Sequence, residues 1–337
     1  MTSTPSRNAS LDALRVLSLL GIVILHVAGG GFADSKPLGF VLDELSRFAV
    51  PVFFVLSAYF WKPDELEHPF GLVARVARRV GVPFVCWVLL TIAWSAAFKP
   101  SQTLDLSPGG IALIAWTGGP AFHLWFLPAL IVGTAITATA GRYLGWRATL
   151  FLAVMLFVIG TVLGSYAPVL LHRTFPAWID RTGIFFAPVF LVAGVLLRRH
   201  RDRVAELPVS AIGLAVVIFA IGQLAEGLFV VPRYPMGHDY SLSTLGYGVS
   251  VAMLFMRLEL RSSIWSALGR ATFTAYLVHL LVMAILVDGL KLGANSLLLI
   301  ALTFATALAI GLAWQWGLGA VRRGPASSGV GVERDHV

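Results

Sequence analysis

The sequence predicts an all-α integral membrane protein with about ten transmembrane helices in one bundle. Hydrophobic residues make up 58% of the 337 positions and charged residues only 12%, whereas about a quarter of the residues of soluble domains are charged. The mean hydropathy is +0.83, and long apolar runs recur along the chain. Together these observations favour a chain that folds in lipid.

Apolar runs of roughly 17–25 residues are typical of helices that cross a bilayer. The predicted spans are residues 11–31, 40–61, 80–98, 122–141, 147–165, 183–198, 207–230, 241–257, 271–290 and 295–318. The connections between them are short, so we expect one membrane domain over residues 1–323 and a disordered cytoplasmic tail over 324–337. The single cysteine, Cys86, excludes a disulfide framework.

The distribution of Lys and Arg predicts that both termini are cytoplasmic, because cytoplasmic loops of membrane proteins carry an excess of basic residues. With the N-terminus inside, 18 of the 25 basic residues lie on the cytoplasmic side and 7 on the outer side. The net charge of +8 therefore reflects membrane topology, and no nucleic-acid partner is expected.

The first predicted span carries three ionisable residues on one face. Asp12 and Arg15 are three positions apart, and Arg15 and His26 are eleven positions apart, which is three helical turns plus about 20°. Asp12 and Arg15 interrupt the apolar run, unlike the h-region of a cleaved signal peptide, so we expect the span to be retained. Ionisable groups in a membrane often mark functional sites. Snorkelling of Arg15 and a structural role for His26 are the alternatives.

Five motifs occur in order along the chain. The first is Arg15, ten residues, then His26; the others are RFAVPVFFVLSAYF (47–60), ARVARRVGVP (74–83), HLWFLPALI (123–131) and TAYLVHLLV (274–282). This pattern resembles the acyltransferase-3 family of membrane O-acyltransferases over nearly the whole chain. It is most similar to the branch that acetylates sugars of bacterial surface polysaccharides. Ala58 stands where the family usually has glycine.

The resemblance implies an O-acyltransferase of the cell membrane that moves an acyl group, expected to be acetyl, from cytoplasmic acyl-CoA. The implied acceptor is a hydroxyl of a sugar, a polysaccharide precursor or a lipid-linked molecule, and the implied partners include polysaccharide-assembly proteins. Acyl-CoA is a substrate, so no permanently bound cofactor is expected. Independently, imidazole can take a hydroxyl proton near neutral pH.

We therefore predict His26 as the general base, with an acyl-histidine intermediate as the less favoured variant. Arg15, oriented by Asp12, is predicted to hold the thioester or pantetheine arm of the donor or to stabilise oxyanion charge.

Donor-binding residues are predicted at the start of the third span and within the ninth. Arg75, Arg78 and Arg79 form a basic cluster that suits the phosphates of coenzyme A, although anchoring of the cytoplasmic end explains the same charges. Tyr276 and His279 are expected beside the donor path on the inner half of the ninth span. A structural histidine is the alternative for His279.

Acceptor-binding residues are predicted toward the outer side. Arg47 lies near the outer end of the second span, and His123 and Trp125 open the fourth. Glu226 is a carboxylate near the outer end of the seventh span. Trp125 as an interfacial belt residue and Glu226 as a charge partner of Arg233 are the alternatives. No metal-binding spacing such as H-x-x-E-H occurs, so no metal is expected.

Two other functional classes also fit a chain with many spans. A polysaccharide or lipid exporter more often has two repeated halves with broken helices at matching positions, and the sequence shows no such symmetry. A membrane scaffold without catalysis does not require the stripe formed by Arg15 and His26. Binding or slow hydrolysis of acetyl-CoA distinguishes an acyltransferase from both.

Overall fold

A computed structural model describes residues 8–29, 35–98, 104–181, 183–231, 234, 238–293 and 296–323. Within them the regular secondary structure is helical, as the sequence predicts. The helices are α1 (Ala9–Ala28), α2 (Lys36–Leu45), α3 (Ala49–Tyr59), α4 (Pro63–Glu67), α5 (Pro69–Phe98), α6 (Pro108–Thr117), η1 (Gly119–Trp125), α7 (Phe126–Tyr143), α8 (Trp146–Leu163), α9 (Ala167–Leu170), α10 (Ala177–Asp180), α11 (Ala187–Arg199), α12 (Arg201–Glu206), α13 (Val209–Ala225), η2 (Glu226–Val230), α14 (Leu242–Arg257), α15 (Ser263–Ala284), η3 (Ile285–Gly289) and α16 (Leu297–Arg323). The predicted tail over 324–337 lies outside the described residues.

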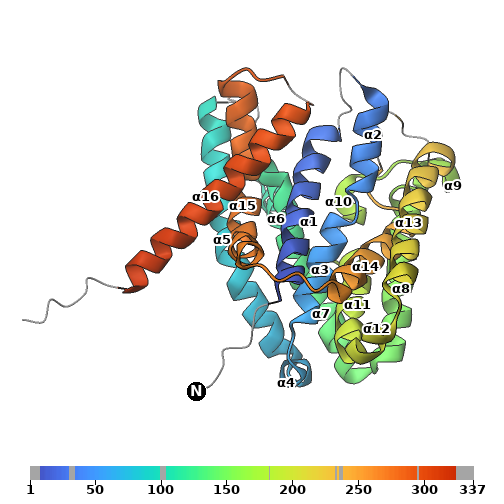
Figure 1. Cartoon of the computed structure of the whole chain (residues 1–337). Coiled ribbons are helices and arrows are strands. Elements are labelled where there is room, and N and C mark those ends of the chain that lie inside the picture. Colours follow the sequence, from blue (N-terminus) through green and yellow to red (C-terminus); the bar gives the residue numbers. More distant parts are fainter. Residues whose placement is uncertain are drawn as a thin grey trace, which may run out of the picture.

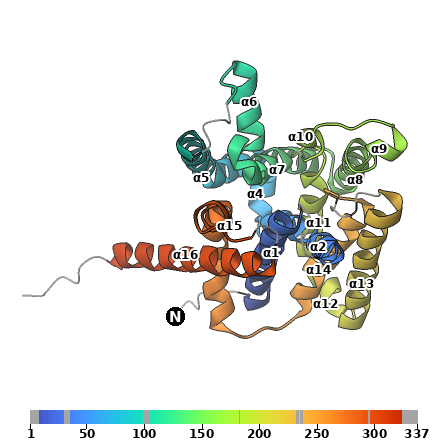
Figure 2. The same ribbon diagram turned by 90° about the horizontal axis from the view of Figure 1, so that it is seen from above.

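Helix α1 lies at the centre of the bundle (Figures 1 and 2). Asn8 caps its N-terminus by accepting hydrogen bonds from the backbone N–H groups of Ser10 and Leu11 at 3.0 and 3.2 Å. The helix packs against α3, α15 and α16, and most of its side chains are buried. A central helix of this kind can carry polar side chains, because protein rather than lipid surrounds them.

In the part of the chain that the structure describes, seven helical segments are long and apolar enough to cross a membrane by length and composition. They are Ala9–Ala28, Pro69–Ala97, Pro108–Tyr143, Trp146–Leu163, Val209–Val230, Ser263–Gly289 and Leu297–Gly317. The other predicted spans correspond to shorter helices: α2 with α3, the 13-residue α11 and the 16-residue α14. The chain is therefore a multi-pass helical membrane protein, and the count of ten spans and the side of each terminus stay predictions.

The peripheral helices expose apolar side chains outward, as contact with lipid requires. On α5, Val82 and Leu89 are 67% and 60% exposed. On α8 and α16, Phe151 and Trp316 reach 70% and 76%. Helix α11, in contrast, is buried along most of its length, which is typical of an apolar helix too short to span.

Two of the predicted spans are interrupted, and each break has a local cause. The second span separates into α2 and α3 at Ser46–Phe48. Pro51 lies in the first turn of α3. In a continuous helix its ring would clash with the backbone carbonyl of residue 47, so the helix begins anew after that residue. The fourth predicted span, 122–141, begins within the 3₁₀ segment η1, which precedes α7 and follows the turn at Gly118 and Gly119, whose φ values are +85° and +56°. Irregular backbone at membrane depth is tolerated where it is buried in protein or lines a cavity.

Helices α3 and α11 approach each other closely at Gly194. A Cβ atom at this position would lie 2.2 Å from the carbonyl oxygen of Val55 and 3.1 Å from the Cβ of Ala58. Ala58, where the resembling family usually has glycine, is fully buried in this contact. The substitution of glycine by alanine is therefore accommodated in the packing between α3 and α11, since Gly194 provides the space.

Gly194→Val is expected to lower the free energy of unfolding by about 1–3 kcal/mol, because backbone atoms of α3 cannot move aside for the new side chain. Thermal unfolding of the detergent-purified protein, followed by tryptophan fluorescence, measures the effect. Gly213→Ala on α13 is the matched control, since nothing lies within 4 Å of its Cβ position. Equal unfolding temperatures for Gly194→Val and wild type would contradict the close approach.

Candidate active site

A cavity of about 920 Å³ extends along α1. Its walls come from α1, α3, α5, η1, α7, α9, α15 and α16, together with the loops that precede α9, α11 and α14. The polar and ionisable side chains that line it are Arg15, His26, Arg47, Ser57, Arg75, Arg79, His123, Ser165, Thr174, Arg181, Asp239, Tyr240, Arg270, Thr272, Tyr276 and Gln315. Both interrupted helices face this cavity.

His26 belongs to a cluster of three histidine rings from three different helices. Its ring centroid lies 5.2 Å from that of His279 on α15 and 6.4 Å from that of His123 on η1. His123 and His279 are 5.1 Å apart. Tyr276 ties η1 to α15, since its hydroxyl donates a hydrogen bond to the carbonyl oxygen of His123 at 2.5 Å.

The hydrogen bonds of His123 and His279 determine which ring nitrogens carry protons. His279 Nδ1 lies 2.6 Å from the carbonyl oxygen of Tyr276 and His123 Nε2 lies 3.4 Å from that of Leu277. A carbonyl only accepts, so both nitrogens donate. The other nitrogen of each neutral ring, Nε2 of His279 and Nδ1 of His123, is buried without a hydrogen-bond partner. Two unused acceptor sites therefore lie in the cluster that contains His26.

At the other end of α1, Arg15 is held between a carboxylate and an aromatic ring. Its Nη1 donates to Asp12 Oδ1 at 2.5 Å, and its guanidinium carbon lies 5.1 Å from the ring centroid of Phe60. The carboxylate of Asp12 is fully buried against Gly269 of α15, where a Cβ atom would clash with it. Asp12 thus positions Arg15 from outside the cavity.

Two of the three predicted donor arginines line the same end of the cavity. Arg75 pairs with Glu65 at 2.7 Å, and Arg79 lies one helical turn further along α5. Arg78 is exposed and does not line the cavity; its Nε donates to the carbonyl oxygen of Ala74 at 3.3 Å. The basic cluster is therefore divided between the cavity and the surface.

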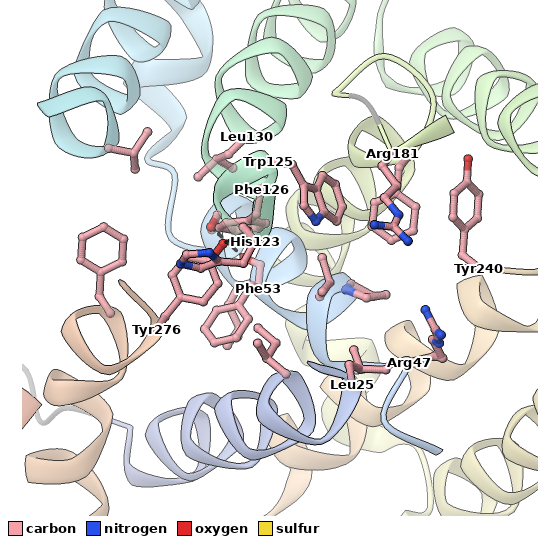
Figure 3. A pocket seen from close by; sticks show the side chains of 18 of the residues that line it. Leu25, Arg47, Phe53, His123, Trp125, Phe126, Leu130, Arg181, Tyr240 and Tyr276 are labelled. Carbon is pink, nitrogen blue, oxygen red and sulfur yellow. Dashed lines mark hydrogen bonds between the residues drawn. The ribbon is translucent and has the colours of Figure 1, made fainter. Parts of the chain in front are cut away.

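The far end of the cavity contains alternating arginine and aspartate side chains. Arg47, in the break between α2 and α3, pairs with Asp43 at 2.5 Å and lies 3.9 Å from Asp239. Arg181 also pairs with Asp239. In Figure 3, Arg47 and Arg181 lie with Tyr240 on one side of the view, and His123 and Tyr276 lie on the other. Trp125 stands between the two groups in that view and packs its ring against Phe186 at 6.0 Å.

A buried polar network holds the loop that carries Asp239 and Tyr240. Glu44 Oε1 accepts hydrogen bonds from the backbone N–H and Nδ1 of His238 at 3.1 and 2.7 Å. Gln223 donates to Glu44 Oε2 at 3.0 Å and accepts from Ser241 and Thr244 at 3.2 and 2.9 Å. These side chains are all buried. The network anchors the loop to α2 and α13.

The model of the family described as "Acyltransferase domain", that of acyltransferase-3, matches residues 8–315. The chain belongs to the acyltransferase-3 family. The match includes every residue that lines the cavity of this membrane acyltransferase.

The curated relatives that the chain matches are described as racemases. The chain is 25% identical to a serine/alanine racemase of Enterococcus gallinarum over 81% of its own length and 40% of the relative. It is also 25% identical to an amino-acid racemase of Enterococcus faecalis, over 83% of its own length and 41% of the relative. The chain therefore spans about two fifths of the length of these curated relatives. No solved structure matches it.

Two of the predicted site residues of this acyltransferase, His123 and His279, have surroundings that the sequence did not indicate. His123 does not open a span but lies in the interrupted middle of the segment Pro108–Tyr143, beside His26 and His279. His279 lies beside His26, in the second half of the helical segment Ser263–Gly289. Its ring is buried behind the residues that line the cavity.

Glu226, predicted to bind the acceptor, lies outside this arrangement. It does not line the cavity and accepts hydrogen bonds from the backbone N–H and hydroxyl of Ser243 at 3.1 and 2.7 Å. It thus satisfies a free N–H group in the first turn of α14. Its alternative partner, Arg233, lies outside the described residues.

Several cavity residues of this acyltransferase were not predicted from the sequence. They are Arg181, Asp239, Tyr240, Arg270 and Gln315. Arg181 carried one usable signal, because arginine is rare on the predicted outer side and a misplaced charge suggests a role there. The loop residues Asp239 and Tyr240 carried no periodic signal.

Proposed function

We propose that this protein transfers an acyl group, expected to be acetyl, from cytoplasmic acyl-CoA to a hydroxyl of a cell-surface sugar or polysaccharide precursor. The observation that carries the proposal is the single cavity that joins Arg15, Arg75 and Arg79 at one end to His26 and the Arg47–Asp239 region at the other. Family membership supports the reaction type. The arrangement suits a charged donor at one end and a hydroxyl-rich acceptor at the other.

In the proposed step His26 is the general base. The acceptor oxygen attacks the thioester carbonyl while His26 takes the hydroxyl proton. The tetrahedral intermediate then collapses, the carbon–sulfur bond breaks, and the leaving thiolate recovers the proton from His26 as the thiol of coenzyme A. An ester forms and a thioester is consumed, with no oxidant or metal required.

His123 and His279 have a role in this step that their fixed tautomers support. Each presents an unused buried acceptor nitrogen in the cluster with His26. When His26 carries the proton, it has a second N–H to donate, and one of these nitrogens can accept it. Both residues then act as positioning groups that stabilise the imidazolium, comparable to the carboxylate of a hydrolase triad.

Arg15 is proposed to hold the donor some distance from the reacting carbon. It lies eleven positions before His26 in one continuous helix, which corresponds to a rise of about 16 Å. A thioester carbonyl beside His26 is too far from Arg15 for direct oxyanion stabilisation. We therefore favour the phosphate or pantetheine part of the donor as its ligand, together with Arg75 and Arg79.

Arg79→Glu is expected to raise the Michaelis constant for acyl-CoA about tenfold or more, because one charge-assisted contact is worth about 1.5–3 kcal/mol. Arg78→Glu is the matched control: it makes the same charge change one residue away, on a side chain outside the cavity. Steady-state kinetics with acetyl-CoA compares the two at equal membrane levels. If both substitutions change the Michaelis constant equally, the cluster does not bind the donor and serves only to orient the protein in the membrane.

The function is tested with purified protein in liposomes and radiolabelled acetyl-CoA. We expect binding and slow hydrolysis of the donor without acceptor, and transfer of label to surface glycan fragments when these are added. Mass spectrometry of surface glycans from a strain that lacks the gene then identifies the acceptor. An exporter or scaffold would neither bind nor hydrolyse acetyl-CoA, and this result would overturn the proposal.

A further inference from the structure

A second cavity, of about 670 Å³, lies beside the first at the predicted cytoplasmic end of the bundle. It is bounded by α4, the adjoining ends of α7 and α8, and the end of α11 with the start of α12, which lie together at the lower end of Figure 1. Its ionisable lining residues are Arg142, Arg198, Arg199, Arg201 and Glu67. Four arginines thus face one carboxylate.

Three of these arginines have no acidic side chain within ion-pair distance in the described part of the chain. Arg142, Arg198 and Arg199 form no ion pair with a described carboxylate, whereas four of the six arginines that line the first cavity (Arg15, Arg47, Arg75 and Arg181) are paired. Arg201 is 74% exposed and lies 3.5 Å from Asp202. The second cavity therefore brings together three arginines whose charge has no direct acidic partner among the described residues.

Two of these three guanidinium groups are fixed in place by contacts that involve no carboxylate. Arg198 Nη1 donates to the carbonyl oxygen of Tyr59 at 3.1 Å. Arg199 stacks over Trp146 with 4.6 Å between its guanidinium carbon and the ring centroid. Positive charge on cytoplasmic loops explains how many basic residues lie here, but it does not require them to converge on a cavity with fixed geometry.

We propose that this second cavity binds an organic phosphate. Guanidinium groups match phosphate oxygens in geometry and charge, and basic pockets at the cytoplasmic ends of membrane helices bind the head groups of anionic lipids. Exposed apolar side chains at the α7–α8 turn, Tyr143 and Leu144, lie next to Arg142 and offer a path for acyl chains. The buried Trp61 lines both cavities, so the nucleotide phosphates of coenzyme A are the second source of the same chemistry.

The site is tested in two arms with the detergent-purified protein. Native mass spectrometry measures retention of added cardiolipin against phosphatidylcholine, and calorimetry measures binding of coenzyme A. In Arg142→Gln, Arg198→Gln the binding of the phosphate ligand is expected to fall by about tenfold or more, since two charge-assisted contacts are lost. Loss in the lipid arm identifies a head-group site, and loss in the coenzyme A arm identifies a nucleotide site.

Two further variants separate binding from folding and from net charge. Arg142→Lys, Arg198→Lys keeps both charges and is expected to retain most of the binding. Arg147→Gln, Arg203→Gln removes two exposed arginines that lie within five residues of Arg142 and Arg198 in the sequence but do not line the cavity. This variant is expected to bind both ligands like wild type. Unchanged binding of both ligands in Arg142→Gln, Arg198→Gln would overturn the proposal. The lipid arm does not depend on acyl transfer, so its outcome is independent of the proposed function.

Discussion

His26→Ala is expected to lower the rate of acyl transfer by about 10²–10⁴-fold, the usual cost of removing a general base. Binding of acyl-CoA is expected to persist, because the arginines proposed to hold the donor lie at the other end of α1. The measurement is acetylation of the native acceptor, with membrane levels matched and donor affinity determined in parallel. A fall in rate without a fall in affinity is the signature of a lost base.

The control for this experiment is His200→Ala, which removes an exposed histidine outside the cavity. Its activity is expected to equal that of the wild type. His279→Ala is expected to give an intermediate loss, because it removes an acceptor beside His26 and leaves the base itself in place. Near-normal turnover in His26→Ala would show that the ionisable stripe on α1 is structural and that the mechanism is wrong.

Arg47→Leu is expected to lower the free energy of unfolding by about 3–5 kcal/mol, because it leaves a buried carboxylate without its partner. The side chain of Asp43 is only 1% exposed, and its Oδ2 lies 2.5 Å from Arg47. The unfolding temperature of the detergent-purified protein measures the loss. Transfer activity should fall as well, since Arg47 lines the cavity where we place the acceptor.

The double variant Asp43→Asn, Arg47→Leu distinguishes this explanation from a simple loss of packing. Removing the buried charge should restore much of the stability, while activity stays low. Arg181→Gln is expected to destabilise the protein less, because its side chain is 37% exposed. If the double variant is no more stable than Arg47→Leu, the unpaired carboxylate of Asp43 is not the cause.

The helical architecture was predictable because membrane helices form from local composition. Asp12, Arg15 and His26 were assigned to one face from spacing alone, and α1 is continuous from Ala9 to Ala28, so Arg15 and His26 both reach the cavity. Interactions between distant segments were not predictable in this way. The pairing of Arg47 with Asp239 joins residues 192 positions apart, and no periodicity connects them.

Breaks in two predicted helices account for the remaining differences between the predicted and the observed locations of the site residues. The proline at residue 51 divides the second span and brings Arg47 into a turn at the cavity, whereas an uninterrupted helix leaves it near an outer end. The glycines before η1 place His123 beside His26 rather than at the membrane surface. Glycine and proline are tolerated in membrane helices, so their presence in an apolar run did not reveal where the chain would bend.

The continuity of α1 also makes it a molecular ruler. Arg15 and His26 share one face of a rigid helix, and the span between them is about 16 Å. A donor that engages both must carry its charged part and its reactive carbonyl at a matching separation, joined by a chain thin enough to pass between the helices. Small activated acyl compounds such as acetyl phosphate are too short to reach both residues. The distance between Arg15 and His26 along α1 would then select donors by the length between their charged group and their reactive carbonyl.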